Sequence, residues 1–199
     1  MFGLINVAIQ EFVQETYSRP VWEQVSRAAG LNFTEFEAML TYDDALTDAV
    51  LESTSAILKK DRQSLLEDVG TFLVTNPIME RVRRLLRFGG REFEEFLMSL
   101  DELTGRVTLA IPDLEMPQIT IRSHGNGIFK IRLECEYEGY GAVLIGILQA
   151  VADDYGALVI SEMTREHSEA GVVEFINLEL LEVSFSEDRG LDLSAGIMS

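Results

Sequence analysis

The chain has 199 residues, of which 47% are hydrophobic and 25% charged, a mixture typical of a folded protein with one sizeable core or two small ones. Its 34 acidic and 16 basic side chains give a formal charge of −18, which argues against nucleic acid as a partner because most of the surface would repel phosphates. The sequence has a single cysteine, which excludes an internal disulfide. It has no basic leader in residues 1–10 and no apolar run of the roughly 20 residues that cross a bilayer. These features predict a cytoplasmic protein without membrane insertion.

The first half of the sequence has helical periodicity, with apolar residues recurring every three or four positions. The predicted helices cover residues 4–13, 21–29, 43–57, 63–74, 77–88 and 91–103. Pro20 suits the first turn of the second helix, and Gly30 suits its C-terminal end. Gly89 and Gly90 are expected to end the helix at 77–88.

The periodicity changes from about 3.6 to 2 after Pro112 and Pro117. Residues 119–133 alternate apolar and polar around the turn sequence HGNG at 124–127, which predicts a β-hairpin. A buried helix is predicted at 140–154, and two more strands at 158–163 and 172–183. The predicted fold is therefore α+β, with an antiparallel sheet in the order strand, strand, helix, strand, strand.

This pattern predicts a single domain at 1–185, made of a helical subdomain (1–111) and an α+β subdomain (112–185), followed by a C-terminal tail at 186–199. Residues that could catalyse a reaction are few. His124 and His167 lie in predicted loops without metal-ligand spacing, and adjacent acidic pairs such as Asp43 and Asp44 point about 100° apart on a helix. The sequence also lacks glycine-rich phosphate loops, so it does not support an enzyme.

One basic cluster stands out on this acidic chain. It consists of Arg81, Arg84, Arg87 and Arg91, with Arg83 beside them. The simplest interpretation is the outer face of an amphipathic helix that pairs with nearby glutamates. Two functional interpretations remain: a docking patch for an acidic partner, in which charge sets orientation and association rate, or a site for a polyphosphate ligand.

Several short segments, in this order and spacing, resemble the heme nitric oxide/oxygen binding (H-NOX) family. They are MFGLIN at 1–6, VW at 21–22, AGL at 29–31, FLMSLDEL at 96–103, Pro117, IGIL at 145–148 and YG at 155–156. The resemblance extends over about residues 1–185 and implies a gas sensor that is not an enzyme. It also implies a heme held between a helical and an α+β subdomain.

The resemblance further assigns roles to individual positions, and this sequence departs from the family at the most important ones. The proximal histidine of the family follows an Asp-Glu-aliphatic triplet, and the corresponding residue here is Thr104. The Tyr-x-Ser-x-Arg motif that binds the heme propionates corresponds to Leu133, Cys135 and Tyr137. Three further positions, Ile5, Ile145 and Pro117, correspond to the pocket wall and stay apolar.

These departures predict an H-NOX-fold regulatory protein that has lost the usual heme ligation. Its expected partner is a separate signalling protein such as a diguanylate cyclase, a histidine kinase or a methyl-accepting chemotaxis protein, and the arginine cluster is the first candidate for the contact. Two alternatives remain open. One is a heme-dependent nitric oxide sensor with a non-standard axial ligand, and the other is a module that binds an apolar small molecule in the former heme cavity.

Overall fold

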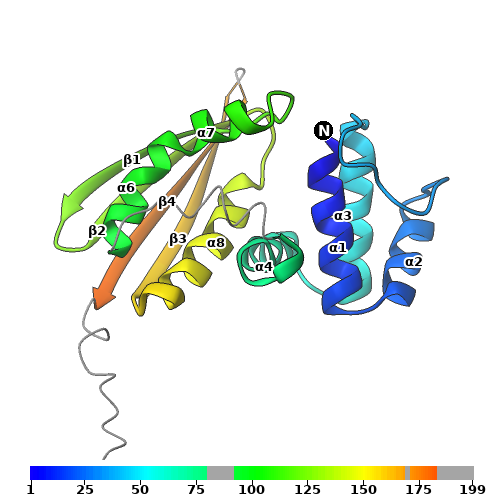
Figure 1. Ribbon diagram of the computed structural model, residues 1–199, viewed down its shortest axis with the longest axis horizontal. Coiled ribbons are helices and arrows are strands. Elements are labelled where there is room, and N and C mark those ends of the chain that lie inside the picture. Colours follow the sequence, from blue (N-terminus) through cyan, green and yellow to red (C-terminus); the bar gives the residue numbers. More distant parts are fainter. Residues whose placement is uncertain (80–91, 169–170, 183–199) are drawn as a thin grey trace, which may run out of the picture.

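The computed structural model describes residues 1–79, 92–168 and 171–182 (Figure 1). The helical first part contains α1 (Gly3–Thr16), α2 (Arg19–Ala28), α3 (Asp44–Leu58), α4 (Arg62–Thr75) and the short 3-10 helix η1 (Pro77–Met79). The second part contains α6 (Phe93–Ser99), η2 (Leu100–Glu102), α7 (Leu103–Ala110), β1 (Gln118–Gly125), β2 (Ile128–Cys135), α8 (Tyr140–Tyr155), β3 (Leu158–Ser168) and β4 (Gly171–Glu182). The predicted α+β class and the predicted order of strands and helix are confirmed.

The four strands form one antiparallel sheet in the order β1-β2-β4-β3. Strands β1 and β2 are joined by Asn126 and Gly127, which both have positive φ angles (51° and 74°), as a tight type I′ hairpin turn requires. The predicted hairpin is confirmed. Its turn is shorter than predicted, because β1 continues through His124 and Gly125. His167, predicted in a loop, also lies on a strand, β3.

One face of the sheet is covered by helices and the other is open. On β2, Phe129, Ile131, Leu133 and Cys135 are buried, while the residues between them are more exposed, as expected for a period of two. These buried side chains form one core with α6, α7 and α8 (Figure 1). The sheet therefore holds α7 and α8 in fixed positions relative to each other.

A second core lies among α1, α2, α3 and α4, around residues such as Val13, Val25, Val50 and Leu65. Local capping sets where these helices begin. The Asp43 and Asp61 carboxylates accept hydrogen bonds from the amides of Ala45 (2.9 Å) and Ser64 (3.0 Å), at the starts of α3 and α4. In Figure 1, α4 lies between α1–α3 on one side and the α8–sheet layer on the other.

The two cores meet where α4 crosses α8. A Cβ atom on Gly70 would lie 2.0 Å from the carbonyl oxygen of Val143, and one on Gly146 would lie 1.9 Å from that of Glu67. The Thr71 hydroxyl donates to the Gly146 carbonyl oxygen at 3.2 Å. The backbones are thus in direct contact, and glycine is required at both positions.

The predicted helix at 91–103 is wrong in its extent. The structure divides this region into α6, η2 and α7, and α7 continues to Ala110. The Asp101 carboxylate within η2 accepts a hydrogen bond from the Ile121 amide on β1 at 2.7 Å, so a tertiary contact fixes the irregular turn. Most of the predicted helix at 77–88, the arginine cluster and the boundary at residue 185 lie outside the described residues. No helix in the described ranges is long and apolar enough to span a membrane.

Candidate functional site

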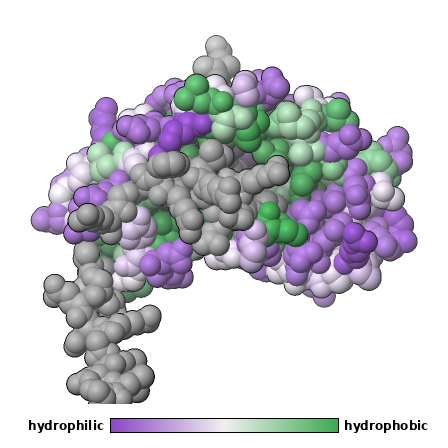
Figure 2. All heavy atoms as spheres, viewed as in Figure 1, coloured by the Kyte–Doolittle hydropathy of each residue, from purple (hydrophilic) through white to green (hydrophobic). Residues whose placement is uncertain are grey.

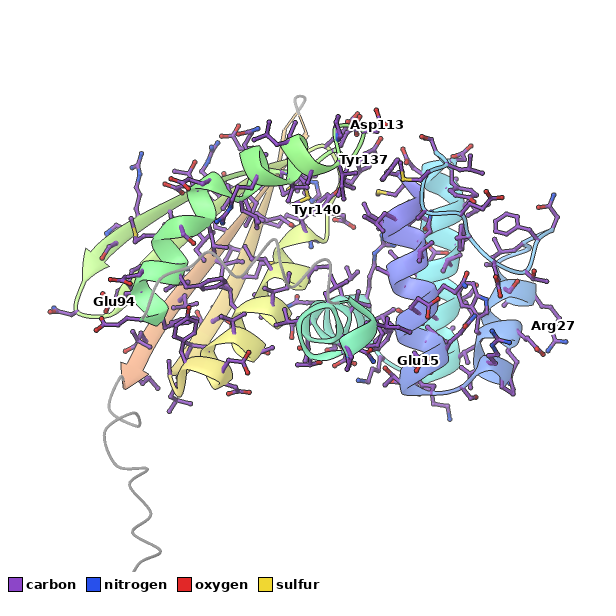
Figure 3. The ribbon with its side chains drawn as sticks, viewed as in Figure 1. Glu15, Arg27, Glu94, Asp113, Tyr137 and Tyr140 are labelled. Atoms are coloured by element: carbon purple, nitrogen blue, oxygen red, sulfur yellow. The ribbon has the colours of Figure 1, made fainter. Side chains whose placement is uncertain are left out.

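An apolar cavity of about 530 Å³ lies between the two parts of the chain. Its walls come from α1, α3 and α4 on one side and from α7, α8 and the segments 111–116 and 137–139 on the other. Figure 3 shows Tyr137 and Tyr140 directed into the space between the sheet layer and α1. In Figure 2, hydrophobic surface is visible along the upper edge, near α7 and the start of α1, whereas the side formed by α2 is mostly hydrophilic. The cavity has the size and apolar lining typical of small-molecule sites.

The wall formed by α7 presents aliphatic side chains to the cavity. Leu103 and Val107 are four residues apart on one face of the helix, and Ile111 follows just beyond its end. Thr104 is turned about 100° away from that face and does not line the cavity. Its buried hydroxyl donates to the Pro117 carbonyl oxygen at 2.6 Å. No histidine or cysteine is among the described residues that line the cavity.

The structure brings only some of the predicted site residues to the cavity. Ile5 on α1 and Tyr137 after β2 line it. Ile145 is buried in the core against the sheet, whereas Tyr140, Val143 and Ile147 are the α8 residues that line the cavity. The remaining predicted residues do not line the cavity. Leu133 and Cys135 belong to β2, and their side chains are buried in the core on the helix-covered face of the sheet. Pro117 contacts Thr104 through its carbonyl group. The four arginines lie outside the described residues: Arg81, Arg84, Arg87 and Arg91.

Carboxylates surround the edge of the cavity. Three acidic residues follow one another at steps of four along α3 and form one stripe on its cavity face: Asp44, Asp48 and Glu52. Glu138 lies on the opposite wall. The Arg62 guanidinium, which also lines the cavity, pairs with Asp48 at 2.5 Å. Apart from Arg62, no arginine or lysine among the described residues lines the cavity. Sequence reasoning missed this stripe, although the spacing of four was visible.

Tyr137 connects the two walls at the cavity edge by a hydrogen bond to Asp44, which also contacts the Met1 amino group. The Met1 amino group, followed by the Tyr137 hydroxyl, holds the pKa of Asp44 below its usual value. The same hydrogen bond raises the pKa of Tyr137 to about 12, and burial raises the pKa of Tyr140 to about 12. Both phenols are therefore neutral at physiological pH.

A buried carboxylate, Glu174 on β4, occupies the N-terminus of α8. It accepts hydrogen bonds from the amides of Gly139 (2.9 Å) and Gly141 (2.6 Å). Arg165 on β3 donates to Glu174 from Nε (3.0 Å), and its other arm pairs with Glu138 at 2.9 Å. An anion at a helix N-terminus is stabilised by the free amides and the helix dipole, and here the chain supplies that anion itself.

The strand pattern of the sequence contains a signal for the burial of Glu174. In the predicted strand at 172–183, Glu174 falls in the same alternating register as Ile176, Leu178 and Leu180. All four side chains are buried in the structure. A charged residue in the inward register of a strand requires a partner of opposite charge, and Arg165 on the neighbouring strand is that partner.

The thiol of Cys135 should be nearly unreactive in the folded protein. Burial, followed by the negative charge of Glu174, raises the pKa of the Cys135 thiol to about 12. The folded state favours the neutral thiol. The Cys135 thiol therefore contributes its full amount to the free energy of unfolding below about pH 9, its ordinary pKa. This contribution decreases as the pH rises toward 12. We expect iodoacetamide to modify Cys135 at pH 8.5 at least about 100-fold more slowly in the native protein than in urea. Equal rates in the two conditions would contradict the assignment.

Comparisons with known proteins agree with this architecture. The family model described as "Haem-NO-binding" matches residues 2–162. Among curated proteins, the chain is 23% identical to soluble guanylate cyclase 89Da of Drosophila melanogaster, over 83% of this chain and 25% of that protein. It is also 23% identical to soluble guanylate cyclase gcy-35 of Caenorhabditis elegans, over 99% of this chain and 31% of that protein. The chain thus spans about a quarter to a third of these relatives.

Solved structures of H-NOX domains share the fold. One, described as the I5F mutant of T. Tengcongensis H-NOX, has a TM-score of 0.75 at 15% identity, covering 93% of this chain and all of that chain. A second, a Cs H-NOX mutant with an unnatural amino acid at site 5, has a TM-score of 0.76 at 14% identity, covering 92% of this chain and 97% of that chain. Because the family model matches most of the sequence, the chain belongs to the Haem-NO-binding (H-NOX) family, whose domains are heme-based gas-sensor modules.

Proposed function

We propose that this chain is an H-NOX sensory domain that regulates a separate signalling protein and does not ligate heme through a proximal histidine. The single observation that supports the proposal is the α7 wall of the cavity. At that wall Leu103 and Val107 face the cavity, and the Thr104 hydroxyl is bonded to the Pro117 carbonyl group. Neither aliphatic side chains nor a threonine supply the nitrogen ligand that holds iron in the family's heme site.

The residues at the cavity edge also fit heme poorly. Heme carries two anionic propionates, and Asp44, Asp48, Glu52 and Glu138 line this cavity. The one lining guanidinium, Arg62, is paired with Asp48. Without an axial nitrogen or a free cation, porphyrin would gain mainly apolar contact, at about 25 cal/mol per Å² of buried area. Heme is therefore expected to bind weakly and without defined ligation.

We further propose that the partner is a separate signalling protein of the diguanylate cyclase or histidine kinase class. The relatives named above are guanylate cyclases, which supports a role in controlling another enzymatic module. Arg81, Arg84, Arg87 and Arg91 remain the proposed docking residues, because they are the densest basic cluster of an acidic chain. A cytoplasmic location is part of the same proposal.

Heme titration tests the proposal. We expect purified protein mixed with ferrous heme to show no stoichiometric Soret band and no defined spectral shift with nitric oxide. Leu103→His should gain a nitrogen-ligated spectrum, because position 103 faces the cavity. Thr104→His should gain much less, because position 104 faces Pro117. Stoichiometric, nitrogen-ligated heme in the unmodified protein would refute the proposal.

A heme-dependent nitric oxide sensor with a non-standard ligand is the second candidate function. The thioether of Met116 lines the cavity and favours this candidate. The phenols of Tyr137 and Tyr140 support it less, because each hydroxyl is already hydrogen-bonded, to Asp44 and to the Glu115 carbonyl oxygen respectively. Under this candidate, Met116→Leu would remove a Soret band that the unmodified protein shows.

A module that binds an apolar small molecule is the third candidate. It is supported by the volume of the cavity, about 530 Å³, and by its apolar lining. A co-purified organic molecule detected by native mass spectrometry would favour it, particularly if Ala8→Phe, which fills part of the cavity, removed that molecule.

A further inference from the structure

We propose that the cavity selects an amphipathic organic cation, an apolar body with an ammonium-type head, in place of an anionic porphyrin. The inference rests on the proposed function, because it requires a cavity that heme does not fill. It adds the chemical class of the ligand and the residues that recognise its two ends. Three features of the described residues support it: the apolar interior, the charges at the edge, and the anion site that the chain fills itself.

The interior suits an aliphatic or aromatic body. Leu66, Val69, Leu103, Val107 and Val143 line it from three different helices. Burial of apolar ligand surface against such side chains contributes about 25 cal/mol per Å². The Thr47 hydroxyl, in the α3 wall, is buried (4% exposed) and has no hydrogen-bond partner among the described residues. The cavity wall therefore contains a polar group that the fold itself does not satisfy.

The edge of the cavity disfavours an anionic head. Arg62 is held by Asp48, and Arg165, just behind Glu138, is shared between Glu138 and Glu174. The amides of Gly139 and Gly141, which would otherwise attract an anion to the start of α8, are both bonded to Glu174. A carboxylate or phosphate head would find neither a free cation nor a free amide among these groups.

The same edge favours a cationic head. Asp48 and Glu52 project from α3 one turn apart, and Glu52 has no ion-pair partner among the described residues. The other three lining carboxylates already have cations of the chain beside them: Asp44 pairs with the Met1 amino group, Asp48 with Arg62 and Glu138 with Arg165. Glu52 is thus the proposed contact of the head, because its carboxylate is the lining acid that a bound cation could pair with.

Two probes of equal chain length and opposite charge test the inference. Isothermal titration calorimetry, below the micelle concentrations, would compare octyltrimethylammonium with octanoate. We expect one octyltrimethylammonium ion to bind per chain, at least about ten-fold more tightly than octanoate, with the preference decreasing as salt screens the carboxylates. Equal affinities, tighter binding of octanoate, or no binding of either probe would overturn the inference.

Matched variants separate recognition at the cavity from general attraction to a chain of charge −18. Glu52→Gln should reduce the preference for the cation at least about three-fold. Glu162→Gln removes the same charge from the exposed surface of β3 and should leave the preference unchanged. Ala8→Phe should abolish binding of both probes by filling the cavity. Equal effects of the two charge variants would overturn the inference, as would unchanged binding in a folded Ala8→Phe protein.

The outcome can be distinguished from failure of the proposed function. Heme titration of the same samples reports whether nitrogen-ligated heme binds, and that result decides the proposed function. If heme does not bind and the cation is not preferred, the proposed function stands and the ligand class is wrong. If heme binds stoichiometrically with nitrogen ligation, both proposals are wrong.

Discussion

Gly146→Ala should destabilise the protein by about 3 kcal/mol or more, an effect at the upper end of those seen for overpacked cores. The added Cβ atom would lie 1.9 Å from the Glu67 carbonyl oxygen, a backbone atom that cannot rotate away. Relief requires α4 and α8 to separate, which also loosens the apolar contact between the two cores. Gly70→Ala is expected to act in the same way, because its Cβ atom would lie 2.0 Å from the Val143 carbonyl oxygen.

Gly105→Ala provides the matched control for these substitutions. Gly105 is exposed on α7, and a Cβ atom there would have no neighbour within 4 Å. Alanine is favoured over glycine within a helix, so this variant should be stabilised by about 0.5–1 kcal/mol. Urea unfolding followed by circular dichroism measures all three variants. A Gly146→Ala protein within about 1 kcal/mol of the unmodified protein would contradict the close helix crossing.

Glu174→Ala should cost about 3 kcal/mol, a value typical of breaking a buried ion pair by removing one partner. The substitution leaves the amides of Gly139 and Gly141 without an acceptor at the start of α8. It also leaves Arg165 with only Glu138, which is largely exposed. Because the Arg165 side chain is itself 31% exposed, water can reach its guanidinium, and the estimate stays at the low end of the range for buried pairs.

Glu138→Ala is the control, since it removes the other carboxylate partner of Arg165. Its carboxylate is 42% exposed, so the expected loss is below about 1 kcal/mol. The free energies of unfolding of both variants, measured by urea titration at pH 7, check the prediction. Similar losses for the two variants would show that Glu174 does not have the special role at the α8 N-terminus that its contacts indicate.

Much of the fold was predictable because it depends on local patterns. The change of hydrophobic period after Pro117 separated the helical part from the sheet, and Asn126-Gly127 marked the hairpin. These signals act over a few residues, through backbone preferences and one buried face. The turn at 100–102 was not predictable, because the Asp101 carboxylate bonds to the amide of Ile121, twenty residues further along the chain.

The candidate site was likewise predictable only in part. Thr104, at the position of the family's ligand, is visible in the amino-acid order alone, and so is the carboxylate spacing of Asp44, Asp48 and Glu52. Which side chains face the cavity depends on how α7 and α8 are rotated against the sheet and α4. That rotation places Leu103 and Val143 at the wall and turns Thr104 and Ile145 away from it. Burial of Glu174 likewise depends on the pairing of β3 with β4, since only that pairing brings Arg165 within hydrogen-bond distance. Residue identity and local periodicity are properties of short segments. Orientation and charge pairing arise from contacts between segments far apart in the chain, and local sequence patterns do not reveal those contacts.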